Sequence, residues 1–162
     1  MKVPMQHFVI EGGHPLRGEI EPAGNKNAAL PVLAATLLTD ERVVLHNIPQ
    51  IEDVRAMLDL LEDLGVEIEQ LGPHDWALQA REVRKASLSP EVCRQIRASI
   101  LLAGPLLARY GQVELPPPGG DVIGRRRLDT HFLALNALGA SIEANHRRYT
   151  LAAPRGLQGN DI

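Results

Sequence analysis

The chain has 162 residues, of which 44% are hydrophobic and 23% charged, an ordinary balance for a folded domain that excludes a disordered chain. Its net charge is −3 and only 3% of its residues are aromatic, so neither nucleic-acid nor membrane-surface binding is expected. No apolar run is long enough to span a membrane. The single cysteine, Cys93, fits a buried small side chain in a reducing compartment better than a reactive thiol. These features predict a cytoplasmic protein.

The first half of the chain alternates between strand and helix patterns. In chain order we expect strand Gly18–Glu21, helix Asn27–Leu38, strand Glu41–His46, helix Ile51–Leu64, and antiparallel strands Val66–Glu69 and Trp76–Gln79. Within helix 51–64 the apolar residues recur at helical spacing, while acidic residues such as Asp53 are expected to face outward. Gly65 occupies the position where a glycine commonly ends a helix.

The second half repeats this order. We expect helix Pro90–Ala108, strand Gln112–Leu115, helix Asp129–Leu138, and paired strands Ala140–Glu143 and Tyr149–Ala153. Pro105 should kink or interrupt the first of these helices.

An internal repeat supports this organisation. Leu61–Glu69 reappears as Leu135–Glu143, and Leu157–Ile162 resembles Leu16–Ile20, the entry to the first half. The expected fold class is therefore α/β (α+β), built from βαβαββ units. The expected segments are a first unit at 1–80, a second unit at 81–156, and the start of a third, missing unit at 157–162.

Lys26 and Asn27 follow a glycine at the start of the first predicted helix. A helix N-terminus offers backbone N–H groups and a favourable dipole to an anion, to which Lys26 would add a charge and Asn27 a neutral donor. The alternative is an ordinary capped helix with a solvated lysine.

Arg94 and Arg97 lie three residues apart, on one face of the predicted helix, and Arg97 precedes a largely apolar run. An arginine beside a buried run must find an acceptor for its head group, which is compatible with anion binding. A structural ion pair, or a side chain that extends to solvent, is the alternative.

The segment 116–131 combines three prolines, the pair Gly119–Gly120, the acidic Asp121 and three consecutive arginines, 125–127. We expect a loop that is stiff at its proline end and hinged at the glycines. Arginine forks beside a carboxyl group suit an anionic ligand and proton transfer, whereas the alternative is a solvated basic loop. The six histidines show no metal-ligand spacing, so no metal site is expected.

Three segments in this order form a recognisable pattern: Gly24–Pro31, then Arg97–Ile100 with Gly104–Arg109, then Pro118–Gly124 followed by Arg126 and Asp129. Together they resemble the UDP-N-acetylglucosamine 1-carboxyvinyltransferase family of enolpyruvyl transferases, over nearly the whole chain. The resemblance implies transfer of the enolpyruvyl group from phosphoenolpyruvate to the 3′-hydroxyl of UDP-N-acetylglucosamine, the first committed step of peptidoglycan biosynthesis, without a cofactor.

The resemblance also implies a fold of two domains, each with three βαβαββ units around a pseudo-threefold axis, and ligands between the domains. This chain would be the N-terminal portion, with residues 1–21 packing on the second domain. By itself it is expected to be inactive and to need the remainder of the enzyme or a complementing chain. The alternatives are a non-catalytic sugar-nucleotide-binding remnant and a paralogue with another acceptor.

The resemblance assigns roles to single residues. Lys26 and Asn27 would hold phosphoenolpyruvate and position the sugar nucleotide, Arg97 would bind phosphate or carboxylate, and Arg126 would contact the phosphate of phosphoenolpyruvate. Asp121 would be the general acid, at a position where most members carry cysteine, so we expect insensitivity to the cysteine-alkylating antibiotic fosfomycin. The segment expected to line the UDP-N-acetylglucosamine site comprises Arg126, Arg127, Leu128, Asp129 and Thr130.

Overall fold

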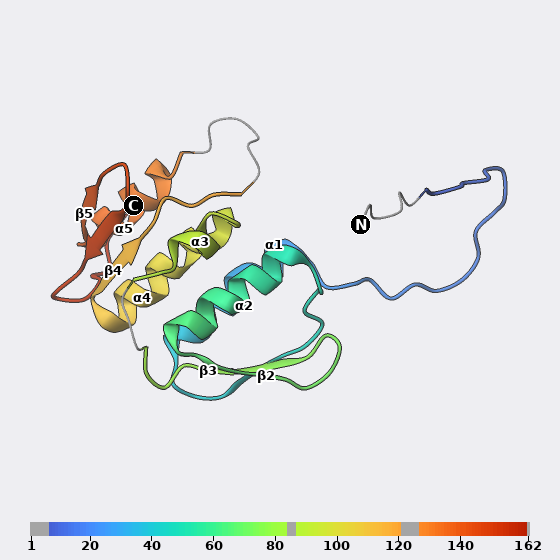
Figure 1. Cartoon of the computed structure of the whole chain (residues 1–162), viewed down its shortest axis with the longest axis horizontal. Coiled ribbons are helices and arrows are strands. Elements are labelled where there is room, and N and C mark those ends of the chain that lie inside the picture. Colours follow the sequence, from blue (N-terminus) through green and yellow to red (C-terminus); the bar gives the residue numbers. More distant parts are fainter. Residues whose placement is uncertain (1–6, 84–86, 121–126, 162) are drawn as a thin grey trace.

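The computed structural model describes residues 7–83, 87–120 and 127–161 (Figure 1). The first half contains α1 (Lys26–Ala35), the 3₁₀ turn η1 (Thr36–Leu38), β1 (Val43–Leu45), α2 (Glu52–Leu64), β2 (Glu67–Gln70) and β3 (Trp76–Gln79). The second half contains α3 (Pro90–Cys93), the 3₁₀ helix η2 (Arg97–Leu102), α4 (Ala103–Tyr110), β4 (Gln112–Leu115), α5 (Asp129–Ala137), β5 (Ser141–Ala144) and β6 (Tyr149–Ala152). The predicted mixed α/β character is confirmed.

Two small antiparallel sheets have the same strand order, β1-β3-β2 and β4-β6-β5. In each, the last strand in sequence lies in the middle, so Leu78 of β3 faces Val43 and Ile68, and Leu151 of β6 holds the equivalent central place. The predicted strand pairings of both halves are confirmed, with strand ends displaced by one or two residues. Gly65 ends α2 with a φ of 100°, as expected for a glycine at that position.

The helices α1, α2 and α4 lie between the two sheets (Figure 1) and share one continuous apolar core. Helix α2 is central to it, because α1, α3 and η2 pack on one side and the first sheet on the other. It consequently buries more than a single stripe of side chains: Val54, Ala56, Met57, Leu58, Leu60, Leu61 and Leu64. Burying such aliphatic groups supplies most of the driving force for folding.

The single helix predicted over 90–108 is wrong. The structure has three pieces there, because Ile96 is extended (φ −132°, ψ 138°) and separates α3 from η2. Pro105 does not cause the break, since it is the third residue of α4, where a missing N–H is tolerated. Arg94 therefore ends α3 and Arg97 begins η2, so the two arginines do not share one continuous helix face.

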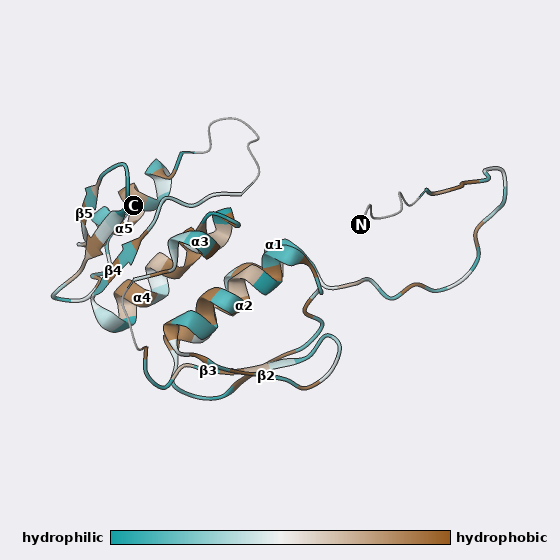
Figure 2. Ribbon diagram, viewed as in Figure 1, coloured by the Kyte–Doolittle hydropathy of each residue, from teal (hydrophilic) through white to brown (hydrophobic). Residues whose placement is uncertain are grey.

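The strand predicted at Gly18–Glu21 is also absent from the structure. Residues 7–22 are extended without strand pairing and leave the body of the protein (Figure 1). Their apolar side chains are almost fully exposed, for example Phe8 at 93% and Leu16 at 96%. Figure 2 shows these hydrophobic stretches in the extended segment. Without a neighbouring strand, the alternation of this segment does not produce a sheet.

Helix α5 differs from α2, its counterpart in the repeat. No residue of α5 is fully buried, and Leu133 is 69% exposed. The helix packs on β5 but carries no second layer of described residues comparable to that over α2. Helix α5 therefore covers one edge of the second sheet, and the outer face of the helix is exposed.

Candidate anion-binding site

The start of α1 is held in place by backbone contacts. A Cβ at Gly24 would lie 1.8 Å from the carbonyl oxygen of Asn47, so only glycine allows this approach. The next residue, Asn25, is the N-cap, and its Oδ1 accepts hydrogen bonds from the N–H groups of Asn27 (2.7 Å) and Ala28 (3.2 Å). At the backbone, the ordinary capped helix is thus confirmed, and these two N–H groups are already engaged. What α1 offers to a ligand is side chains.

Lys26 is paired rather than simply solvated. Its ammonium forms an ion pair with the carboxylate of Asp53, in the first turn of α2. Asp53 was expected to face outward, yet its side chain is only 29% exposed because the packing of α1 on α2 turns it toward Lys26. The predicted outward orientation of Asp53 is therefore wrong.

A cavity of about 210 Å³ lies where α1, α2 and η2 meet. Its lining residues are Lys26, Asn27, Leu30, Asp53, Gln95, Ile96, Arg97, Ala98 and Gly120. The structure thus brings together three of the predicted binding residues, Lys26, Asn27 and Arg97, from segments 70 residues apart in sequence. Of the described side chains that line it, two are cationic and one is anionic.

Arg97 reaches this cavity from the first position of η2. The break at Ile96 starts a new helix at Arg97 and directs its half-buried side chain toward α1. Its Nη2 also donates to the carbonyl oxygen of Arg127 at 3.3 Å. The guanidinium therefore has a backbone acceptor and also lines the cavity. Its environment is compatible with both a structural role and anion binding.

The glycine pair is docked on the end of α3 by backbone hydrogen bonds, and its predicted role as a hinge stays a prediction. The N–H of Gly119 donates to Cys93 O (2.9 Å), and that of Gly120 to Arg94 O (3.0 Å). A Cβ at Gly119 would lie 1.8 Å from Arg94 O, and Gly120 has a φ of 87°. The broken helix supplies the free carbonyls, and the glycines let the loop approach them. Asp121 and Arg126 lie outside the described residues, but the chain enters that segment from the cavity wall at Gly120.

The segment after this loop does not reach the same cavity. Arg127 forms an ion pair with Asp129 at 2.5 Å, and Thr130 is exposed. Leu128 is only 7% exposed because it packs in the core. None of Arg127, Leu128, Asp129 and Thr130 lines the cavity, although the carbonyl of Arg127 accepts a hydrogen bond from Arg97. Their assignment to a sugar-nucleotide site stays a prediction.

Four further residues of the cavity were not singled out from the sequence: Leu30, Gln95, Ile96 and Ala98. Gln95 and Ile96 line it because the helix breaks between Arg94 and Arg97, and no local signal predicted that break. Asp53 was noticed only as an outward-facing acid. The one signal that could have predicted its pairing with Lys26 was its opposite charge in the first turn of the next helix.

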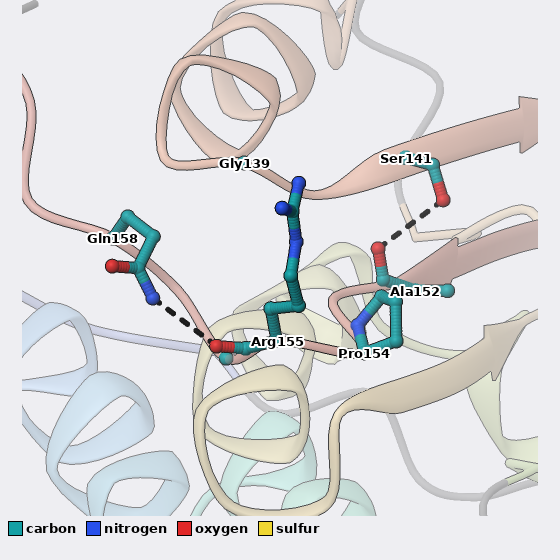
Figure 3. Close-up of a pocket in the computed structure, with 7 residues that line it drawn as sticks. Gly139, Ser141, Ala152, Pro154, Arg155 and Gln158 are labelled. Carbon is teal, nitrogen blue, oxygen red and sulfur yellow. Dashed lines mark hydrogen bonds between the residues drawn. The ribbon is translucent and has the colours of Figure 1, made fainter.

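A larger cavity of about 490 Å³ lies at the end of the second sheet, lined by Gly139, Ser141, Ala152, Pro154, Arg155, Gly156 and Gln158. Figure 3 shows Arg155 extending along it, with Gln158 Nε2 donating to the Arg155 carbonyl and Ser141 Oγ to that of Ala152. Arg155 is exposed, and it is the one cation among the described lining residues. The smaller cavity, with two cations and a neutral amide, is the better candidate for an anion.

The described residues contain no group of three or more His, Cys, Asp or Glu side chains arranged to hold a metal ion. No helix among them is both long and apolar enough to cross a membrane.

The fold is that of an enolpyruvyl transferase. The chain superposes on the enolpyruvyl transferase NikO from Streptomyces tendae with a TM-score of 0.71, at 22% identity, over 91% of this chain and 32% of that one. The EPSP synthase from Acinetobacter baumannii gives a TM-score of 0.64 at 17% identity, over 88% of this chain and 33% of that one. The chain belongs to the EPSP synthase (3-phosphoshikimate 1-carboxyvinyltransferase) family, whose family model matches residues 10–162.

Sequence relatives are closer and carry a different name within this family. The chain is 54% identical to the UDP-N-acetylglucosamine 1-carboxyvinyltransferase of Bradyrhizobium diazoefficiens, over 98% of this chain and 36% of the relative. It is 51% identical to the enzyme of that name from Treponema denticola, over 98% and 37%, respectively. The family resemblance inferred from the three motifs is confirmed. The chain spans about a third of the length of these curated relatives.

Proposed function

We propose that this chain forms part of a cytoplasmic enzyme that transfers the enolpyruvyl group of phosphoenolpyruvate to the 3′-hydroxyl of UDP-N-acetylglucosamine, the entry step of peptidoglycan biosynthesis. The observation that carries the proposal is the cavity in which Lys26, Asn27 and Arg97 meet beside Gly120, the residue before Asp121. Relatives at 54% and 51% identity that bear the name of this activity support it.

In this proposal Lys26 and Arg97 bind the anionic groups of phosphoenolpyruvate. An ammonium supplies a point charge, whereas a guanidinium supplies parallel N–H donors that match phosphate or carboxylate oxygens. Asn27 adds a neutral donor beside them. Arg126 completes the phosphate contacts, and the segment Arg126–Thr130 contacts the sugar nucleotide.

Asp121 is the proposed general acid. As the sugar 3′-oxygen adds to C2 of phosphoenolpyruvate and gives its hydroxyl proton to a base from the remainder of the enzyme, the Asp121 carboxyl transfers its proton to the methylene carbon, C3. Loss of phosphate from C2 and of a proton from C3 then restores the double bond and completes the transfer. The docking of Gly119 and Gly120 supports this role, since it starts the Asp121 segment at the wall of the cavity that holds Lys26 and Arg97.

We further propose that the two halves are βαβαββ units, 1–80 and 81–156, of a three-unit domain, with residues 157–162 starting the third unit. The shared strand order of the two sheets supports the equivalence of the halves. The parallel bridge between Ser87 and Glu114 supports a first strand in the second unit. The remainder of the active site would come from the other two thirds of the length that the relatives have.

The test measures both binding and turnover. The 162-residue chain is titrated with phosphoenolpyruvate and with UDP-N-acetylglucosamine by calorimetry, and phosphate release is followed with both present. We expect binding without turnover by this chain, and turnover once a polypeptide covering the remaining two thirds of the Bradyrhizobium relative is added.

Turnover by the chain without any addition would refute the incomplete-site part of the proposal. Binding of the sugar nucleotide with no turnover in any combination would instead show a non-catalytic binding protein. Release of phosphate only with another acceptor alcohol would show a paralogue.

A further inference from the structure

The candidate cavity contains an acid that the proposed chemistry does not use. Asp53 lines the same wall as Lys26 and Arg97, and its carboxylate forms an ion pair with the Lys26 ammonium. Neither side chain is fully buried: Lys26 is 51% exposed and Asp53 29%. An anionic ligand that reaches Lys26 therefore also comes close to Asp53.

Capping of α2 does not account for Asp53. The N-cap residue of this helix is Ile51, which has no side-chain cap, and its carbonyl accepts from the N–H groups of Val54 and Arg55. Asp53 lies in the first turn, where the helix dipole favours a negative charge. Its carboxylate is directed across the α1–α2 contact to Lys26.

We propose that Asp53 is a positioning residue that acts through Lys26, as an internal counter-ion that competes with the ligand phosphate and sets its affinity. With the cavity empty, Asp53 holds the ammonium at the wall. A phosphate must share that ammonium with Asp53 and is repelled by the carboxylate, so it binds more weakly than two cations would allow and leaves more readily. This inference rests on the proposed function for the identity of the ligand as a phosphate ester.

The experiment uses inorganic phosphate and phosphoenolpyruvate as probes and compares Asp53→Asn with Glu52→Gln. The second substitution removes the same charge from the adjacent, exposed residue of α2, which does not line the cavity. At fixed ionic strength, Asp53→Asn should tighten phosphate binding about tenfold, and Glu52→Gln should change it less than about twofold.

Lys26→Met tests whether Asp53 changes phosphate affinity through Lys26. If Asp53 acts through Lys26, the gain from Asp53→Asn should shrink to less than about twofold in the Lys26→Met background, because the contested ammonium is gone. A purely structural role of Asp53 would lower the melting temperature but would not tighten binding. Asp53→Ser provides a second variant should Asp53→Asn fail to fold.

Unchanged or weaker phosphate binding by the folded variants, an equal gain from Glu52→Gln, or a full gain without Lys26 would each overturn the proposal. Failure of the proposed function has a different signature. In that case phosphate binding still tightens in Asp53→Asn, while phosphoenolpyruvate binds no better than phosphate and UDP-N-acetylglucosamine does not bind.

Discussion

Gly119 shows how a single residue can position a functional loop. Its N–H bonds to Cys93 O, and any side chain at this position would collide with the carbonyl of Arg94. The requirement is for close approach of two backbones, at a helix end whose carbonyls would otherwise lack partners. Composition predicted a hinge here, and the structure adds that both glycines contact the end of α3.

Gly119→Ala should therefore lower the free energy of unfolding by about 2 kcal/mol or more, since the loop must move away from Arg94 O. Urea denaturation measures this change. Gly104→Ala is the matched control, because Gly104 lies in α4 and a Cβ there would have no neighbouring atom within 4 Å. This substitution should be neutral or stabilise by up to about 1 kcal/mol. Equal effects of the two substitutions would contradict the docking role of Gly119.

Cys93 is fully buried, as expected from the sequence, and burial raises the pKa of its thiol to about 11 from an ordinary value of 9.0. The folded state therefore keeps its proton where the unfolded state loses it. Stability from this group is complete below pH 9 and is lost as the pH rises to about 11.

Comparing urea midpoints of the wild type and Cys93→Ala at pH 8 and pH 10.5 tests this pH dependence. The wild type should lose more stability across that interval than the variant does. At pH 8 the native thiol should also react slowly with Ellman's reagent and rapidly in denaturant. Fast labelling of the native protein would contradict the burial of Cys93.

Asp121 leads to a prediction about inhibition. A carboxylate is a poorer soft nucleophile than a thiolate, so the proposed enzyme should resist covalent inactivation by fosfomycin. Time-dependent inactivation of the reconstituted activity provides the measurement, with Asp121→Cys as the comparison that should become sensitive. Rapid covalent inactivation of the form with aspartate would count against this role of position 121.

At the scale of elements, one arginine adds hydrogen bonds between the two halves to the apolar core that they share. Arg109, in the last turn of α4, donates to Leu37 O (3.1 Å), Thr39 O (2.9 Å) and Arg81 O (3.1 Å). It thereby satisfies carbonyls at the end of η1, in the first half, and at Arg81 just after β3, where the second half begins. Five donors in a planar fork suit this task, and an ammonium could not reproduce the same geometry.

Arg109→Ala should cost about 2–3 kcal/mol of unfolding free energy, because three backbone acceptors lose a charged donor. Arg148→Ala is the control: it removes an exposed ion pair with Glu114 (3.2 Å) and should cost less than about 1 kcal/mol. Thermal or urea unfolding of both variants measures the difference. Similar losses would show that Arg109 does not join the halves.

The elements that the sequence predicted well are those with local causes. Strand Trp76–Gln79, strand Gln112–Leu115 and the end of α2 at Gly65 follow from alternation and from glycine at a helix end. The break at Ile96 could not be predicted in the same way. The carbonyls at the end of α3 accept from the N–H groups of Gly119 and Gly120, which are more than 20 residues away in sequence.

The candidate site was predictable to a similar extent. The cations Lys26 and Arg97 were recognised from their neighbours in sequence, and the structure places both at one cavity. Asp53 was misplaced, since an acid in the first turn of an amphipathic helix is usually solvated and only the packing of α1 on α2 turns it inward. Residue type predicted the cations of the site, whereas the orientation of Asp53 depends on long-range packing.

At the scale of the whole molecule, the second half has an open apolar side. Leu133 of α5 is 69% exposed and lies with Phe132 and Ile142 along a shallow depression. The N-terminal segment adds further exposed apolar side chains, including Phe8 and Leu16. Exposed apolar surface of this kind favours association.

The 162-residue chain should consequently self-associate as its concentration rises, and Leu133→Lys should shift that equilibrium toward the monomer. Sedimentation velocity over a concentration series measures both effects. Leu38→Lys is a control at another exposed leucine, 56% accessible on η1, and should have the smaller effect. A monomeric wild type at all concentrations would contradict the prediction.

The bridge made by Arg109 also has a consequence for synthesis on the ribosome. The carbonyls of Leu37 and Thr39 leave the exit tunnel about 70 residues before the Arg109 guanidinium that donates to them. Helix α1 likewise emerges well before η2, which packs on it. At about 5–20 residues per second, the nascent first half remains without these partners for several seconds. Its apolar helices lack part of their packing during that interval, so contacts between nascent chains are expected to compete with folding.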